Sequence, residues 1–240
     1  MQRGTPQAGT VTDTAEVHAW DLPTRLFHWS LVVLIAAAYV SRHWGDANLV
    51  WHIWNGYAIL VLIVWRILWG VLGSSTSRFS SFVYGPISAA RYAMDFLLRK
   101  PRHFLGHNPL GGIVVFLLLG LVGAMAVLGL FAYDDHDGFV GGPLSGRVSD
   151  AVWGFATRWH IRLFDFLLYA IGLHIVANIL YVVWKRENLV RAMMTGRKPA
   201  KNYEDQSRAR LASPWLAVSC LFLAIAIVFG AIIAAGGKVV

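Results

Sequence analysis

The segment WHIRLFDFLLYAIGLH, residues 159–174, is apolar along most of its length and carries a histidine near its start and another at its end. His160 and His174 are 14 residues apart, and in an α-helix this is four turns less about 40°. Their side chains therefore leave one face of the helix at two levels roughly 21 Å apart. Two interpretations fit: the helix gives one axial ligand to each of two stacked haems, or it carries one structural and one interfacial histidine.

The rest of the chain has the composition of a membrane protein. Of its 240 residues, 57% are hydrophobic and 14% are charged, whereas soluble domains have about 45–50% and about 25%. With a mean hydropathy of +0.54, the chain is not expected to be a soluble enzyme, a disordered tail or a nucleic-acid-binding module. The single cysteine, Cys220, excludes a disulfide framework, a zinc site and an iron–sulfur cluster.

Five stretches without Asp, Glu, Lys or Arg are long enough, or nearly so, to cross a bilayer, which takes about 20 residues. They are residues 26–41, 47–65, 103–133, 166–184 and 211–237. The first is short, but Arg25 and Arg42 can extend their side chains toward the interface. We therefore predict an all-α integral membrane bundle of five transmembrane helices, in which four form a haem-binding core and the fifth follows at the C-terminus.

Lys and Arg are distributed unevenly between the two sides of this bundle. With the N-terminus inside, 16 of them are cytoplasmic and five are outside, namely Arg42, Arg147, Arg158, Arg162 and Lys238. The positive-inside rule then predicts a cytoplasmic N-terminus and an external C-terminus. Residues 1–23 lack the apolar core of a signal peptide and are predicted to be a polar tail. Residues 24–200 are predicted as the haem-binding domain, and residues 201–240 as a linker with the fifth helix.

A long cytoplasmic segment separates the second and third spans. From Pro86 on, charged residues alternate with apolar residues at helical spacing, which are Ile87, Ala90, Met94, Leu97 and Leu98. This pattern predicts an amphipathic helix over residues 87–98 at the membrane surface. Asn108 and Pro109 are predicted as the N-cap and first residue of the third span.

Partner histidines follow from topology, because a six-coordinate haem needs a second imidazole at matching depth. His28 lies near the inner end of the first span and His52 near the outer end of the second. The fourth span runs inward, so His52 pairs with His160 and His28 with His174. The inner depths match poorly, since His174 is 11 residues from the next charge and His28 is three from Arg25. Either the fourth helix extends beyond the bilayer or the first begins before Arg25.

Glycines and arginines near these histidines have two interpretations each. Gly56 follows His52 by one turn and Gly172 precedes His174 by two residues; they leave room for a flat macrocycle or serve helix packing. Ligand positions are also flanked by arginines, which pair with haem propionates or anchor the helices at the interface. These are Arg25, Arg158 and Arg162.

Five histidines remain outside the two pairs. His43, at the outer end of the first span, is the rival of His52. His107, at the inner end of the third span, either caps that helix or hydrogen-bonds a quinone carbonyl or a haem propionate. The others lie in polar segments and are predicted to be solvated: His18, His103 and His136.

Several of these residues together resemble the bacterial cytochrome b-561 and nickel–iron hydrogenase b-type cytochrome group. The resemblance runs from about Trp20 to Arg197. The matching segments are WDLPTRLFHW at 20–29, His52 with Gly56 and Arg66, GHNPLG at 106–111, Trp159-His160 and Gly172-Leu173-His174.

This resemblance implies a helical bundle in the bacterial inner membrane with two haem b groups, each held by two histidines. His28 and His174 would hold the cytoplasmic-side haem, and His52 and His160 the periplasmic-side one. Electrons would pass between a periplasmic partner and membrane quinone. Some members serve a hydrogenase or another periplasmic redox enzyme, some exchange electrons with c-type cytochromes, and small four-helix relatives oxidise superoxide and reduce ubiquinone. The fifth span is similar to that of the hydrogenase subunits.

Our leading hypothesis is electron transfer through two haems, in a chain whose partners are the lipid bilayer, quinone, a redox protein and, as an option, further copies of itself. One alternative is an oxidoreductase that acts on superoxide or another small molecule at the outer haem. Another is a transporter with a histidine relay, which would need carboxylates deep in its spans. The sequence fits both an electron-transfer subunit and a quinone-linked oxidoreductase.

Overall fold

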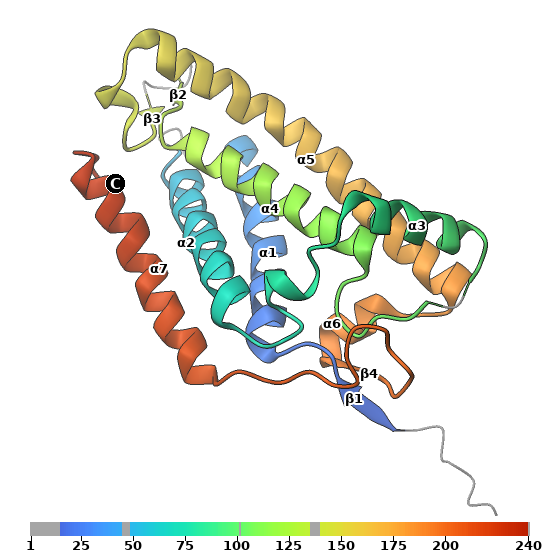
Figure 1. The fold of residues 1–240 in the computed structure, drawn as a ribbon. Helices are drawn as coiled ribbons and strands as arrows, with labels where there is room; N and C mark the ends of the chain where they lie inside the picture. Colours follow the sequence, from blue (N-terminus) through green and yellow to red (C-terminus); the bar gives the residue numbers. More distant parts are fainter. Residues whose placement is uncertain (1–14, 45–48, 101, 135–139, 240) are drawn as a thin grey trace, which may run out of the picture.

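The computed structural model describes residues 15–44, 49–100, 102–134 and 140–239, and most of them are helical (Figure 1). Five helices are long and apolar enough to cross a membrane, which confirms the predicted all-α bundle with five spans. They are α1 (Leu22–Trp44), α2 (Val50–Leu72), α4 (Pro109–Gly129), α5 (Asp150–Lys185) and α7 (Pro214–Ala234).

Helix α2 is the centre of the bundle. It packs against α1, α4 and α7, while α5 packs on α4 (Figure 1). In the described part of the chain, the backbones of α1 and α5 make little contact with each other. The four helices that carry the predicted core therefore form an open arc, α1–α2–α4–α5. Its two ends are α1, which carries His28, and α5, which carries His160 and His174.

Aromatic side chains of α2 hold this arrangement together. The Trp65 indole stacks between the rings of Phe27 and Trp69, with centroid distances of 5.7 Å and 5.5 Å. Its Nε1 donates to the carbonyl of Ala217 at 3.0 Å, which ties α7 to α2. Burying large aromatic rings with their N–H groups satisfied is a strong source of stability. The fifth helix is thus packed into the bundle core.

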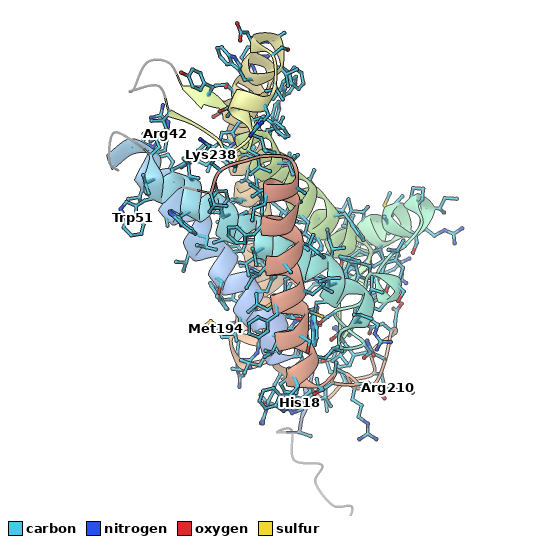
Figure 2. The ribbon with its side chains drawn as sticks, turned by 90° about the vertical axis from the view of Figure 1, so that its left-hand side faces the viewer. His18, Arg42, Trp51, Met194, Arg210 and Lys238 are labelled. Carbon is cyan, nitrogen blue, oxygen red and sulfur yellow. The ribbon has the colours of Figure 1, made fainter. Side chains whose placement is uncertain are left out.

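The bundle has two distinct ends. At one end β1 (Glu16–His18) pairs in antiparallel fashion with β4 (Arg197–Pro199); we call it the β1 end. At the other end β2 (Tyr133–Asp134) and β3 (Val140–Gly141) form a short hairpin; we call it the hairpin end. The chain enters the bundle at the β1 end and finishes α7 at the hairpin end, near Arg42 and Lys238 (Figure 2).

The limits of α5 and α1 bear on the poor match in depth between His28 and His174. Its 36 residues span about 54 Å, well beyond the roughly 30 Å hydrocarbon core of a bilayer. Helix α1 begins at Leu22, three residues before Arg25. The structure confirms that the first helix begins ahead of Arg25. Helix α5 is also long enough to extend beyond the bilayer, and its extension at the inner side stays a prediction.

Short elements cover the β1 end. They are the 3-10 helix η1 (Phe79–Ser81), α3 (Pro86–Leu97) and α6 (Leu189–Thr195), while η2 (Ser145–Arg147) lies at the hairpin end. Helix α3 confirms the predicted amphipathic helix. Its buried residues are Ala89 and Tyr92, whereas the apolar stripe that includes Ile87 and Met94 is exposed, as expected for a face that meets lipid.

Candidate haem-binding site

The hairpin-end pair, His52 and His160, consists of two oriented imidazoles on facing helices. The ring centroids are 6.0 Å apart and the planes are nearly perpendicular, at 85°. Nδ1 of His52 donates to the carbonyl of Ala38 at 2.9 Å, and Nδ1 of His160 donates to that of Met125 at 2.8 Å. Because a carbonyl can only accept, the proton is on Nδ1 in both rings and Nε2 keeps its lone pair for a metal.

The distance between the two rings is that expected for two imidazoles on one metal ion. Bonds of about 2.0–2.1 Å from each imidazole to a transition metal bring the two ring centres to about 6 Å. The described residues contain no cluster of three or more His, Cys, Asp or Glu side chains that would hold a bare metal ion. A haem supplies four ligands of its own and needs only two from the protein, so the pair fits a haem iron.

The β1-end pair, His28 and His174, is less constrained. The two rings are close enough for their charges to interact. Nδ1 of His28 is buried without a hydrogen-bond partner. Nε2 of His174 lies 3.2 Å from the amide nitrogen of Asn178, which also donates to the His174 carbonyl at 2.7 Å. Among the described residues, no backbone carbonyl accepts a hydrogen bond from either ring, so this pair lacks the orienting contacts of the hairpin-end pair.

Glycines shape the space around the histidines. A Cβ on Gly129 of α4 would lie 3.0 Å from Cε1 of His160, so this glycine makes room for the ring; the sequence reasoning missed it. A Cβ on Gly56 would meet nothing within 4 Å, and its role at a macrocycle stays a prediction. Gly172 also faces open space, but it lies about 200° around α5 from His174, so we assign it no role.

The predicted arginines contact the histidine pairs little. Nη1 of Arg25 donates to the carbonyl of Met194 in α6. Arg158 and Arg162 are exposed, and they lie about 160° and 200° around α5 from His160. The structure thus gives these two no contact with the site, and their role at haem propionates stays a prediction.

Arg42, which the sequence analysis treated only as a flank of the first span, is near the site. Its charge acts on both His52 and His160, and it lies at the hairpin end (Figure 2). Its place at the end of α1, one turn past Ala38, is the signal that links it to the hairpin-end pair.

The remaining described histidines lie elsewhere. Nδ1 of His43 hydrogen-bonds the carbonyl of Tyr39 at 2.9 Å on an exposed surface, so His52, not His43, faces His160. His103 was expected to be solvated but pairs with Glu187. His18 is exposed in β1, and His136 lies outside the described residues.

His107 is buried between two aromatic rings rather than capping a helix. Its ring centroid lies 4.7 Å from that of Trp20 and 4.5 Å from that of Phe82. The cap of α4 is Asn108, whose Oδ1 accepts from the Gly111 amide at 2.9 Å, as predicted. Burial and nearby positive charge lower the pKa of His107 to about 3, so the imidazole is neutral at physiological pH.

Comparison with known proteins decides the family. Residues 19–196 match the family described as "Prokaryotic cytochrome b561". The chain belongs to this cytochrome b561 family. Similar curated proteins are each titled "Probable Ni/Fe-hydrogenase B-type cytochrome subunit". The one from Bradyrhizobium diazoefficiens is 26% identical over 214 residues, covering 76% of this chain and 85% of the relative. The one from Rhizobium leguminosarum bv. viciae is 23% identical over 225 residues, covering 79% and 91%.

Membership of the cytochrome b561 family implies haem b and membrane electron transfer. The residues present fit that group, because the hairpin-end pair leaves two Nε2 atoms free. At the β1 end, buried nitrogens without partners include Nδ1 of His28, Nδ1 of His107 and Nη1 of Arg66. Such atoms are costly to bury unless a ligand satisfies them.

Proposed function

We propose that this cytochrome holds two haem b groups, one between His52 and His160 and one between His28 and His174, and transfers electrons across the membrane. The observation that carries this proposal is the hairpin-end pair, whose two Nδ1–H groups are bound to carbonyls at 2.9 Å and 2.8 Å and whose rings are 6.0 Å apart. The second pair uses the same face of α5, about 21 Å further along the helix.

Haem iron, when bound, supplies one-electron redox chemistry. The chain's own residues fix the imidazoles, exclude water and set the local charge, which together tune the reduction potential. Donation from Nδ1 to the carbonyls of Ala38 and Met125 keeps each ring in one tautomer and one orientation. Between the two levels, Leu167 is fully buried and keeps water out of the helix interface.

The partners follow from the topology that we propose. The predicted distribution, with 16 Lys and Arg residues on the inner side and five outside, favours a cytoplasmic β1 end and a periplasmic hairpin end in the bacterial inner membrane. The hydrogenase titles of the similar proteins support a periplasmic hydrogenase or another redox protein as the electron partner there. Membrane quinone is the proposed partner at the cytoplasmic side.

The first test is haem quantification with a reduced-minus-oxidised spectrum of the purified protein. We expect a b-type spectrum and two haems per chain. His28→Ala should remove one of them, and His103→Ala, which changes a histidine paired with Glu187, is the matched control and should keep both. A spectrum without a b-type signal, or a single haem in the unaltered protein, would refute the proposal.

Electron transfer is tested separately in membrane vesicles that contain the holoprotein. Reduction of the hairpin-end haem by an impermeant donor on that side should be followed by reduction of a quinone analogue. His28→Ala should stop the second step and leave the first. If quinone is reduced normally in that variant, the β1-end haem is not on the electron path.

A further inference from the structure

Arg66 is a buried cation without a bonded partner. It lies in the interior of α2 and is 3% exposed. Among the residues that the structure describes, its guanidinium makes no hydrogen bond or ion pair, and its Nη1 is fully buried. An arginine carries five N–H donors and stays charged at any physiological pH. A guanidinium in this state calls for an acceptor that is not part of the chain.

The carboxylate whose charge acts on Arg66, that of Asp21, does not supply that acceptor. Asp21 is also buried, but its oxygens accept hydrogen bonds from neutral groups: the amide of Thr24 at 2.7 Å, Nε1 of Trp69 at 3.2 Å and Oγ of Ser77 at 3.2 Å. Its charge reaches Arg66 through space, without a direct ion pair. Asp21 therefore offsets part of the charge and leaves the N–H groups unsatisfied.

The surroundings of Arg66 are built to hold the guanidinium in place. Its Cζ lies 4.7 Å from the centroid of the Phe79 ring, within the range of a cation–π interaction. Gly70, one turn further along α2, leaves space for that ring, because a Cβ there would come within 2.2 Å of it. The η1 segment thus forms a platform on which Arg66 rests.

A second buried nitrogen lies in the same region. His107, from the loop before α4, has its Nδ1 buried without a partner. Its ring centroid lies 4.5 Å from that of Phe82, which lies 5.9 Å from the Phe79 ring on which Arg66 rests. The charges of Arg66 and His174 also act on the His107 ring. Two unsatisfied buried nitrogens from different elements are therefore found in the region of His174, one of the proposed ligands of the cytoplasmic-side haem.

We propose that Arg66, assisted by His107, binds a propionate carboxylate of the β1-end haem. This inference rests on the proposed function, since it requires a haem between His28 and His174. A carboxylate matches the planar fork of a guanidinium with two parallel hydrogen bonds, and haem b carries two such groups at its edge. The imidazole of His107 adds one further donor in its Nδ1–H form.

The test compares Arg66→Gln with Arg91→Gln in the purified holoprotein. Arg91 is exposed on α3 and serves as the matched control. Loss of the buried positive charge beside a propionate stabilises the ferric state, so Arg66→Gln should lower the midpoint potential of the β1-end haem only. It should also shift the propionate bending band in the resonance Raman spectrum. Arg66→Lys should restore part of the potential but not the band, because it keeps the charge and loses the fork.

The outcomes separate this inference from the proposed function. If the unaltered protein lacks two haems, the proposed function fails first. If two haems are present and Arg66→Gln leaves both potentials and the propionate band unchanged, the propionate assignment is wrong. Unchanged haem signals together with a lost response to quinone would also overturn it and would assign Arg66 to a quinone oxygen. Should Arg66→Gln not accumulate, His107→Phe gives the same readouts, with a shift expected in the band of the β1-end haem alone.

Discussion

The two histidine pairs share helix α5 but differ in the hydrogen bonds that orient their imidazoles. At the hairpin end, both imidazoles are held by helix carbonyls, Ala38 for His52 and Met125 for His160. At the β1 end, the Nδ1 of His28 and the Nη1 of Arg66 are both buried without a hydrogen-bond partner among the described residues. The difference indicates that the backbone alone sets ligand orientation at one end, whereas a bound cofactor must complete the polar network at the other.

The largest expected effect is on the oriented pair. His160→Ala removes an imidazole whose position no other described histidine occupies, so the haem content should fall from two per chain to one, with the β1-end haem retained. Pyridine haemochrome assay and redox titration measure this. His43→Ala is the control and should keep two haems, since its ring bonds Tyr39 away from the site. Retention of both haems in His160→Ala would reassign the ligand.

A second variant changes the packing of α4 against the His160 ring. Gly129→Ala places a Cβ 3.0 Å from Cε1 and 3.2 Å from Nδ1 of His160, so the ring must shift and its hydrogen bond to the Met125 carbonyl is disturbed. Loss of such an orienting contact weakens metal binding by about 10–100-fold. Haem retention during dilution into detergent measures the effect. Gly120→Ala on the open side of α4, where a Cβ meets nothing within 4 Å, should behave like the unaltered protein.

A third variant tests what fixes the β1 end of α5. The hydroxyls of Tyr92 and Tyr181 are 2.6 Å apart, and the Asn108 amide donates to Tyr181 at 2.8 Å, which joins α3, α4 and α5 beyond His174. Tyr92→Phe should lower the free energy of unfolding by about 1 kcal/mol. Thermal unfolding in detergent, with the exposed Tyr169→Phe as control, measures it. Equal losses in the two variants would contradict this role.

The same tyrosine predicts a pH dependence. Burial raises the pKa of Tyr92 from 10.0 to about 12. Between these values the unfolded chain loses the proton and the folded chain keeps it, so stability falls as the pH rises through this range. Tyr92→Phe should therefore flatten the loss of stability between pH 10 and 12. An unchanged pH profile in this variant would assign the loss to other groups.

The smallest expected effect concerns Asn178. Its amide lies 3.2 Å from Nε2 of His174, the nitrogen that would bind iron in the proposed site. If that contact is given up when the haem binds, Asn178→Ala should keep two haems and change the β1-end potential only slightly. Loss of the β1-end haem would instead show that this amide orients His174 as the carbonyls orient the other pair.

Much of the fold follows from the sequence for physical reasons. Long stretches without charge must satisfy their backbone within a helix, so α2, α4 and α7 could be located directly. The 14-residue spacing in α5 placed two histidines on one face. The pairing of β1 with β4 could not be predicted, because it joins residues about 180 positions apart through three-residue strands that carry little pattern of their own.

The site was predicted less completely than the fold. His52 and His160 were paired from depth alone, and the structure brings them together. Arg66 was named in the family resemblance but was given no functional role, because an arginine that ends an apolar run is typical of the end of a span. Only tertiary packing shows that its side chain is 3% exposed. Arg158 and Arg162 were predicted from proximity along the chain, which does not report the side of the helix on which a residue lies.

Helix α5 also fixes the spacing between His160 and His174. Both proposed haem sites take one ligand from the same unbroken helix of 36 residues, so the separation of these two ligands is set by helical pitch and not by loops or by packing between helices. Inserting a single residue between His160 and His174 would swing the second ligand by about 100° and take it out of line. The spacing between the two histidine levels can therefore change only in steps of whole helical turns, and a tilt of α5 moves both histidines together.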